Sequence, residues 1–226
     1  MEEGDIMRGS VLASLLLACA ASCGAQEAPG KEVSAPATVP VVAAIPLQAG
    51  LSVDVQWTPL RGRPLSRLYR CRVVNVTERS VEYRTEHQAG SALHVVTNRV
   101  DNPNYTGDWS ETRDDQLPHT WPWIGLEAGK QLQAGEAGQT TVTLVDLLAG
   151  ERRSYLYVGT GTVPCLVGGQ PALVPCWTLV SGNGATISVM ASAENPLTLQ
   201  TYEPGASLQR TLAITGPTIT MGAPGQ

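Results

Sequence analysis

Hydrophobic and polar residues alternate along much of the chain between residues 51 and 101. In LSVDVQW, residues 51–57, every second side chain is apolar. The segments 68–76 (LYRCRVVNV) and 81–87 (VEYRTEH) alternate in the same way, with the polar segment TERS between them. A period of two residues is typical of a half-buried strand, and a short polar connection favours a hairpin. We therefore predict three strands here and a fourth over residues 91–100.

The alternation returns after residue 139. We expect six more strands, at residues 140–150, 153–164, 172–181, 185–192, 197–202 and 208–215. Turn signals rich in Gly, Asn and Pro separate them, such as SGNG at 181–184 and EPG at 203–205. The number and spacing of these strands predict an all-β domain, either an antiparallel sandwich or an open half-barrel.

Residues 101–138 keep little of the alternation, and a short helix over residues 126–134 is the one regular element we expect there. A connection of this length is usually functional or mobile. It contains Trp109, Trp121 and Trp123. Exposed indoles on a loop can stack on sugars or bury into a lipid or partner surface, so these are candidate ligand-binding residues. Alternatively, they cover the open end of the β core in a chain without Phe.

Composition narrows the function classes. The chain has 226 residues, of which 15% are charged, and its net charge is -5. A nucleic-acid-binding domain normally carries a basic patch, and the Arg-rich stretch at residues 61–72 is balanced by acidic residues further on. We therefore expect no nucleic-acid partner.

The N-terminus has the composition of an export signal. The apolar stretch from Val11 to Ala21 is about half the roughly twenty residues that span a bilayer. It ends in Ala20-Ala21-Ser22-Cys23-Gly24, which resembles the lipobox of bacterial lipoproteins. The resemblance implies cleavage before Cys23 and a diacylglycerol on its thiol, with a stable membrane anchor as the result. It also implies a bacterial cell-envelope location, at the outer membrane or on the periplasmic face.

Three alternatives stay open at this end of the chain. Cys19 closes a competing lipobox, and ordinary cleavage after Ala25 would leave no lipid. Met7 would remove the acidic residues before the signal if it were the initiator.

The expected division of the chain is a signal peptide (1–22), a Pro- and Ala-rich linker (23–50), the β domain (51–216) and a flexible tail (217–226). A first strand near residues 39–45 is the alternative to a fully extended linker.

The remaining cysteines suggest one disulfide and one free thiol. Val-Pro-Cys occurs twice, ending at Cys165 and Cys176, with the turn sequence GGQP between them. Neighbouring strands in an oxidising compartment favour a bond between these two. Cys71 is then left as a buried thiol, although it could pair with either of the others. The histidines lack metal-ligand spacing and the acidic loop at 101–115 does not fit a calcium loop, so we expect no metal or cofactor.

The sequence contains no nucleophile or zinc-hydrolase motif, and we expect a non-catalytic binding domain. Its ligand would be a lipid, a polymer or another envelope protein. The order of lipobox, Pro-rich segment and antiparallel strands is similar to that of periplasmic half-barrel lipid carriers of the lipoprotein-localisation-factor type. The alternative is a carbohydrate-binding or adhesion β-sandwich that uses Trp109, Trp121 and Trp123.

Overall fold

The structure is a computed structural model that describes residues 39–60, 67–78, 80–89, 92–101, 123–146 and 151–222. The chain divides into two units, Met1–Ala37 and Thr38–Gln226, and every described residue belongs to the second. Cys23, Trp109 and Trp121 lie outside the described ranges. Among the described helices, none is long and apolar enough to cross a membrane.

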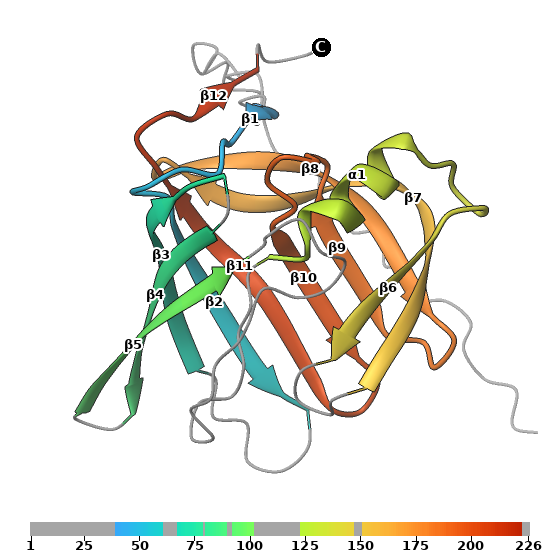
Figure 1. Ribbon diagram of the computed structural model, residues 1–226, viewed down its shortest axis with the longest axis horizontal. Helices are drawn as coiled ribbons and strands as arrows, with labels where there is room; N and C mark the ends of the chain where they lie inside the picture. The colour runs from blue at the N-terminus through green and yellow to red at the C-terminus, as the bar shows by residue number, and fades with distance from the viewer. Residues whose placement is uncertain are drawn as a thin grey trace, which may run out of the picture. The chain divides into compact units, whose positions relative to one another are not determined.

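The described part of the second unit consists mostly of strands (Figure 1). The first five are β1 (Val42–Ala44), β2 (Ser52–Pro59), β3 (Arg67–Val76), β4 (Ser80–Ala89) and β5 (Ala92–Asp101). After α1 (Leu126–Ala134) come β6 (Thr141–Asp146), β7 (Glu151–Val167), β8 (Gln170–Ser181), β9 (Thr186–Met190), β10 (Thr198–Glu203), β11 (Ser207–Thr215) and β12 (Thr220–Met221). All ten predicted strands and the short helix are confirmed over the residues that the structure describes; residues 91 and 147–150 of two predicted strands lie outside them.

Ten strands form one large sheet in the order β5, β4, β3, β2, β11, β10, β9, β8, β7 and β6, and all neighbours in this order are antiparallel. The outermost strands, β5 and β6, do not pair with each other, so the described strands do not close into a barrel. The end of the long strand β7 also pairs in parallel with β11 at Ala213 and Ile214. The expected all-β antiparallel class is confirmed, as one large open sheet and a separate two-stranded sheet of β1 and β12.

Two apolar clusters fill the domain. The first lies against the inward faces of β2, β3 and β4, where Val53, Val55 and Val73 are completely buried. The second joins Ala128 and Leu132 of α1 to β6–β9, and Figure 1 shows the helix lying across this end of the sheet. The alternation read from the sequence appears directly in β3, whose buried and exposed residues alternate from Tyr69 to Val73.

The ends of the predicted β domain differ from expectation. β1 lies in the segment expected to be a linker and confirms the alternative, a first strand near residues 39–45. It pairs with β12, which lies in the segment expected to be a flexible tail. Val42 and Ile45 belong to the first apolar cluster, so the burial of these side chains draws the segment into the fold. The ordered domain thus begins before Leu51 and continues past Gly216.

The predicted turns are present. Gly168 and Gly169 form the β7–β8 connection with φ of +59° and +82°, values that Gly adopts without steric cost. In the SGNG turn, Gly184 has φ of +83°, and the Asn183 side chain accepts a hydrogen bond from the Ala185 N–H at 3.1 Å. These local signals set the hairpin registers.

Candidate ligand-binding site

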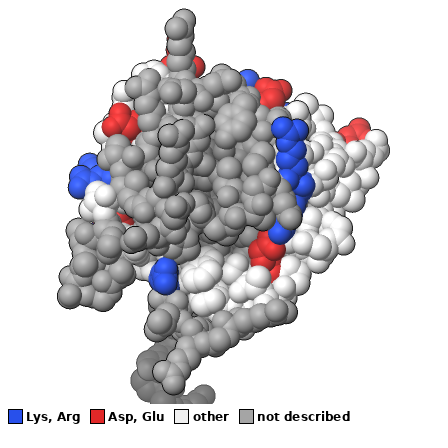
Figure 2. All heavy atoms as spheres, turned by 60° about the horizontal axis from the view of Figure 1, so that its bottom comes forward, with Lys and Arg blue, Asp and Glu red and all other residues white. Residues whose placement is uncertain are grey.

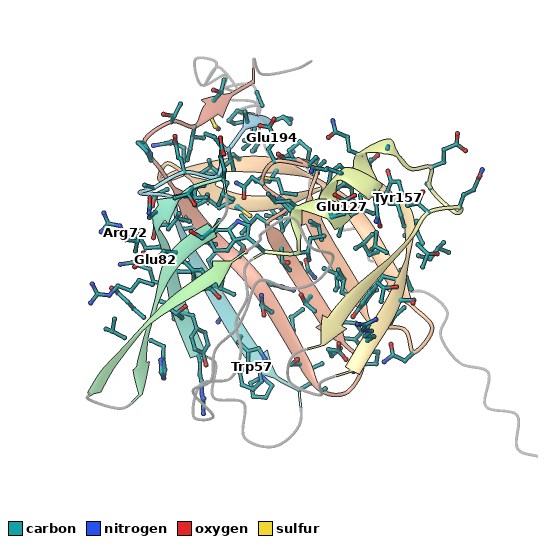
Figure 3. The ribbon with its side chains drawn as sticks, viewed as in Figure 1. Trp57, Arg72, Glu82, Glu127, Tyr157 and Glu194 are labelled. Carbon is teal, nitrogen blue, oxygen red and sulfur yellow. The ribbon has the colours of Figure 1, made fainter. Side chains whose placement is uncertain are left out.

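One row of side chains on the inward sheet face combines an indole with polar groups. Trp57 of β2 lies opposite Arg67 of β3 on one side and Gln209 of β11 on the other. Thr201 of β10 extends the row beyond Gln209. Directly opposite residues of an antiparallel pair share a face, and Trp57 continues the face of Val53 and Val55. We call Arg67, Trp57, Gln209 and Thr201 the Trp57 row. Figure 3 labels Trp57, near the end of β2.

The next row of the same face is also polar. His87 of β4 lies opposite Tyr69 of β3, and their rings stack with centroids 5.3 Å apart and planes at 28°. Both side chains are buried. Thr211 of β11 closes this row, opposite Val55, and donates its hydroxyl to the Thr198 carbonyl at 2.9 Å. The inward face therefore changes from apolar at Val53 and Val73 to polar and aromatic toward Trp57.

One buried polar atom on this face has no partner among the described residues. Gln209 Nε2 makes no hydrogen bond with them, whereas the Tyr69 hydroxyl interacts with the Arg67 side chain. Gln209 is 8% exposed and Tyr69 is completely buried. Burial raises the pKa of Tyr69, and the neighbouring Arg67 guanidinium acts in the opposite direction. A buried donor without a partner costs free energy, which a ligand with hydrogen-bonding groups could recover.

The outward face of the same strands is charged but balanced. Arg70 donates two hydrogen bonds to the Asp54 carboxylate, at 2.7 and 2.9 Å, and these bonds raise the pKa of the guanidinium. Arg84 lies 3.4 Å from a carboxylate oxygen of Glu86. On the face drawn in Figure 2, basic side chains lie close to acidic ones, and no large patch of one sign appears among the described residues.

A separate pocket of about 370 Å³ opens at the end of the sheet where β1 and β12 pair. The segment from β1 to Pro46 and the middle of β8 form two of its walls, and the segment from Met190 to Glu194 forms a third. Gln133, in the last turn of α1, Thr218, and Thr220 of β12 also line it. The pocket shares no residue with the Trp57 row.

The structure corrects the expectation for Trp123. This residue is completely buried, its Nε1 donates to Asn195 Oδ1 at 2.7 Å, and its ring meets Tyr83 edge-on at 5.8 Å. A side chain held in this way cannot stack on an external ligand, so Trp123 is not a ligand-binding residue. It covers the β core, which was the alternative interpretation.

The expected disulfide is absent from the structure. Cys165 and Cys176 do lie on neighbouring strands, but both are buried and form no disulfide; Cys71 is buried as well. The β7–β8 register places Cys165 opposite Ala172 and Cys176 opposite Gly161, so the two cysteines are not cross-strand partners. Burial raises the pKa of Cys165 to about 11, with a smaller contribution from Cys176. The expectation of a buried Cys71 thiol is confirmed.

The residues that compose the Trp57 row were visible in the sequence only in part. Alternation placed Trp57 on the buried face of its strand, but Gln209 lies about 150 residues further along the chain. Their proximity depends on the pairing of β2 with β11, for which no local pattern exists. Among the described residues, no group of three or more His, Cys, Asp or Glu side chains could hold a metal ion.

Comparison with protein-family models, curated proteins and solved structures gave no match to this chain.

Proposed function

We propose that this protein is a bacterial cell-envelope lipoprotein whose non-catalytic β domain binds a carbohydrate on the Trp57 row. The anchor rests on the lipobox-like sequence that ends at Cys23 and on the short apolar stretch before it. A lipid on Cys23 would hold the domain at a membrane surface, where cell-wall and surface glycans are abundant.

The observation that carries the choice of ligand is the Gln209 side chain beside Trp57. An indole offers an apolar surface to the C–H face of a sugar ring, while planar amide and guanidinium groups bond hydroxyls at the ring edge. Gln209 and Arg67 lie on either side of Trp57 and supply such groups. An acyl chain would cover the indole equally well but would give the buried Gln209 Nε2 no partner.

The charge of the row favours neutral and acidic glycans. Arg67 is its one charged side chain, and His87 stands in the adjoining row. A uronic acid carboxylate could pair with the Arg67 guanidinium in a bidentate manner. The outward-facing arginines of β3 are less suited to this role, because Arg70 is already occupied by Asp54.

Titration with defined oligosaccharides tests the binding site. The probes are chitotetraose, cellotetraose and tetragalacturonate, followed by indole fluorescence and calorimetry. We expect one of them to bind, and Trp57→Ala to weaken its affinity about tenfold. Arg67→Ala should weaken binding of the acidic probe, whereas Arg72→Ala, which removes an outward-facing arginine of the same strand, should not.

Gln209→Leu separates binding from stability. Gln209 Nε2 is buried without a partner among the described residues, so replacing the side chain by an apolar one of similar size should leave the free energy of unfolding unchanged or raise it. The same substitution should weaken glycan binding, because the amide donor is lost. If no oligosaccharide binds, or if phosphatidylglycerol vesicles bind in a Trp57-dependent manner instead, the carbohydrate proposal is wrong.

The anchor is tested in cells by metabolic labelling with palmitate. Label and membrane association should be lost in Cys23→Ser and kept in Cys19→Ser. Loss in Cys19→Ser alone would move the anchor to the competing lipobox, and an unlabelled protein that begins after Ala25 would refute lipidation.

A further inference from the structure

We propose that the pocket at the β1–β12 end of the domain binds a small organic cation, a primary ammonium group on an apolar body. This site is independent of the Trp57 row. The charge, the lining and the rigidity of the pocket each favour such a ligand.

The charge of the described lining is negative. Among the lining residues that the structure describes, Glu194 is the one charged side chain, and none is Lys, Arg or His. Gln133 brings the last turn of α1 to the pocket, and this turn holds no basic residue. The final carbonyl groups of a helix carry partial negative charge, which favours a cation nearby. The Glu194 carboxylate and the C-terminus of α1 therefore both favour a cation in this pocket. Figure 3 labels Glu194 at this end of the sheet.

The rest of the lining accommodates an apolar body. Val42, Ile45, Val174 and Met190 form its buried base, and Ser192 adds a hydroxyl. A volume of about 370 Å³ falls near the lower end of the range for small-molecule pockets, about 300–1,000 Å³. The pocket is therefore suited to a compact aliphatic or aromatic amine rather than to a long acyl chain.

Hydrogen bonds fix the walls in place. The Ala191 N–H donates to the Pro175 carbonyl at 2.9 Å, which joins the segment after β9 to β8. The Asn195 N–H donates to Ser192 Oγ at 3.2 Å, and Asn195 Nδ2 donates to the Ile45 carbonyl at 2.7 Å. A pocket whose walls are already ordered loses little conformational entropy when a ligand enters.

The test compares two probes that differ in charge and hardly in shape, 2-phenylethylammonium and 2-phenylethanol. Their affinities for the full chain are measured by calorimetry and ligand-observed NMR at low ionic strength. We expect the ammonium to bind about fivefold more tightly, and added salt to reduce this difference. Equal affinities, or no saturable binding of either probe, would overturn the proposal.

Two variants locate the effect. Glu194→Gln should abolish the preference for the ammonium, while Glu78→Gln, an equal charge change on the β3–β4 turn outside the described pocket lining, should keep it. Ala191→Phe should block both probes by filling the pocket. A preference that survives Glu194→Gln refutes the site, whatever Ala191→Phe does to folding. Glycan titrations of Glu194→Gln should match those of the parent chain, so that failure at one site is distinguished from failure at the other.

Discussion

Trp123 and Asn195, 72 residues apart in the chain, are joined by a hydrogen bond of 2.7 Å between two completely buried side chains. The Asn195 amide also donates to the Ile45 carbonyl at 2.7 Å. One side chain therefore connects the segment after β1, the residue that leads into α1 and the loop before β10. Because these polar groups have no access to water, each depends on the others for its hydrogen bond.

Asn195→Ala should lower the free energy of unfolding by about 3 kcal/mol. The substitution leaves the Trp123 indole N–H and the Ile45 carbonyl buried without this partner, and each such group costs about 1–3 kcal/mol. Urea denaturation followed by far-UV circular dichroism measures the change. Asn75→Ala, at an exposed position of β3, is the matched control and should change stability by less than about 0.5 kcal/mol.

Gly129→Ala should destabilise the protein although Ala favours helices. A Cβ at this position would lie 3.1 Å from Pro196 Cβ and 3.2 Å from the Ala193 carbonyl oxygen. Relief of glycine's helix penalty stabilises by about 1 kcal/mol, but forcing α1 away from this segment costs about 1–3 kcal/mol. We expect a net loss near 1 kcal/mol in urea denaturation. Gly182→Ala, where a Cβ meets no atom within 4 Å, should be close to neutral.

The start of the domain can be located by truncation. A chain that begins at Thr38 should unfold with the same free energy as one that begins at Cys23, because the compact unit starts at Thr38. A chain that begins at Leu51 lacks Val42 and Ile45, and should lose about 3 kcal/mol or more. Equal stability of all three chains would show that β1 contributes nothing to the fold.

The strands could be predicted because each carries its own signal. In β2, the apolar side chains at positions 53 and 55 are needed on one face only, so burial imposes a period of two that is visible in the sequence. The SGNG and GGQP turns are equally local, since Gly at φ above zero is required within the turn itself.

Pairing between distant strands leaves no such signal. β1 has three residues, and its stability comes from β12, nearly 180 residues later, and from the hydrogen bond between Ile45 and Asn195. The Trp57 row likewise depends on β2 meeting β11. The prediction of a disulfide was wrong for a related reason. The sequence placed Cys165 and Cys176 correctly on neighbouring strands, but the strand register decides which residues face each other.

Alkaline pH should destabilise the protein through Cys165. Burial raises the pKa of this thiol from 9.0 to about 11, and it also raises the pKa of Cys176. The unfolded chain releases these protons near pH 9 while the folded chain keeps them. The stabilisation is therefore complete below pH 9 and is lost as the pH rises toward 11. Urea midpoints measured at pH 8, 9 and 10 should fall in this order.

Replacement of the thiols identifies the groups responsible. The double variant Cys165→Ala and Cys176→Ala should be less stable at pH 8, because the smaller side chains leave space in the core. Its midpoint should nevertheless fall less between pH 8 and pH 10 than that of the parent chain. The Tyr69 hydroxyl, whose pKa is also raised by burial, adds its effect only above pH 10, where the unfolded chain begins to lose that proton. If the urea midpoint of the double variant fell as steeply below pH 10 as that of the parent chain, the two cysteines would be excluded as the cause of the alkaline destabilisation.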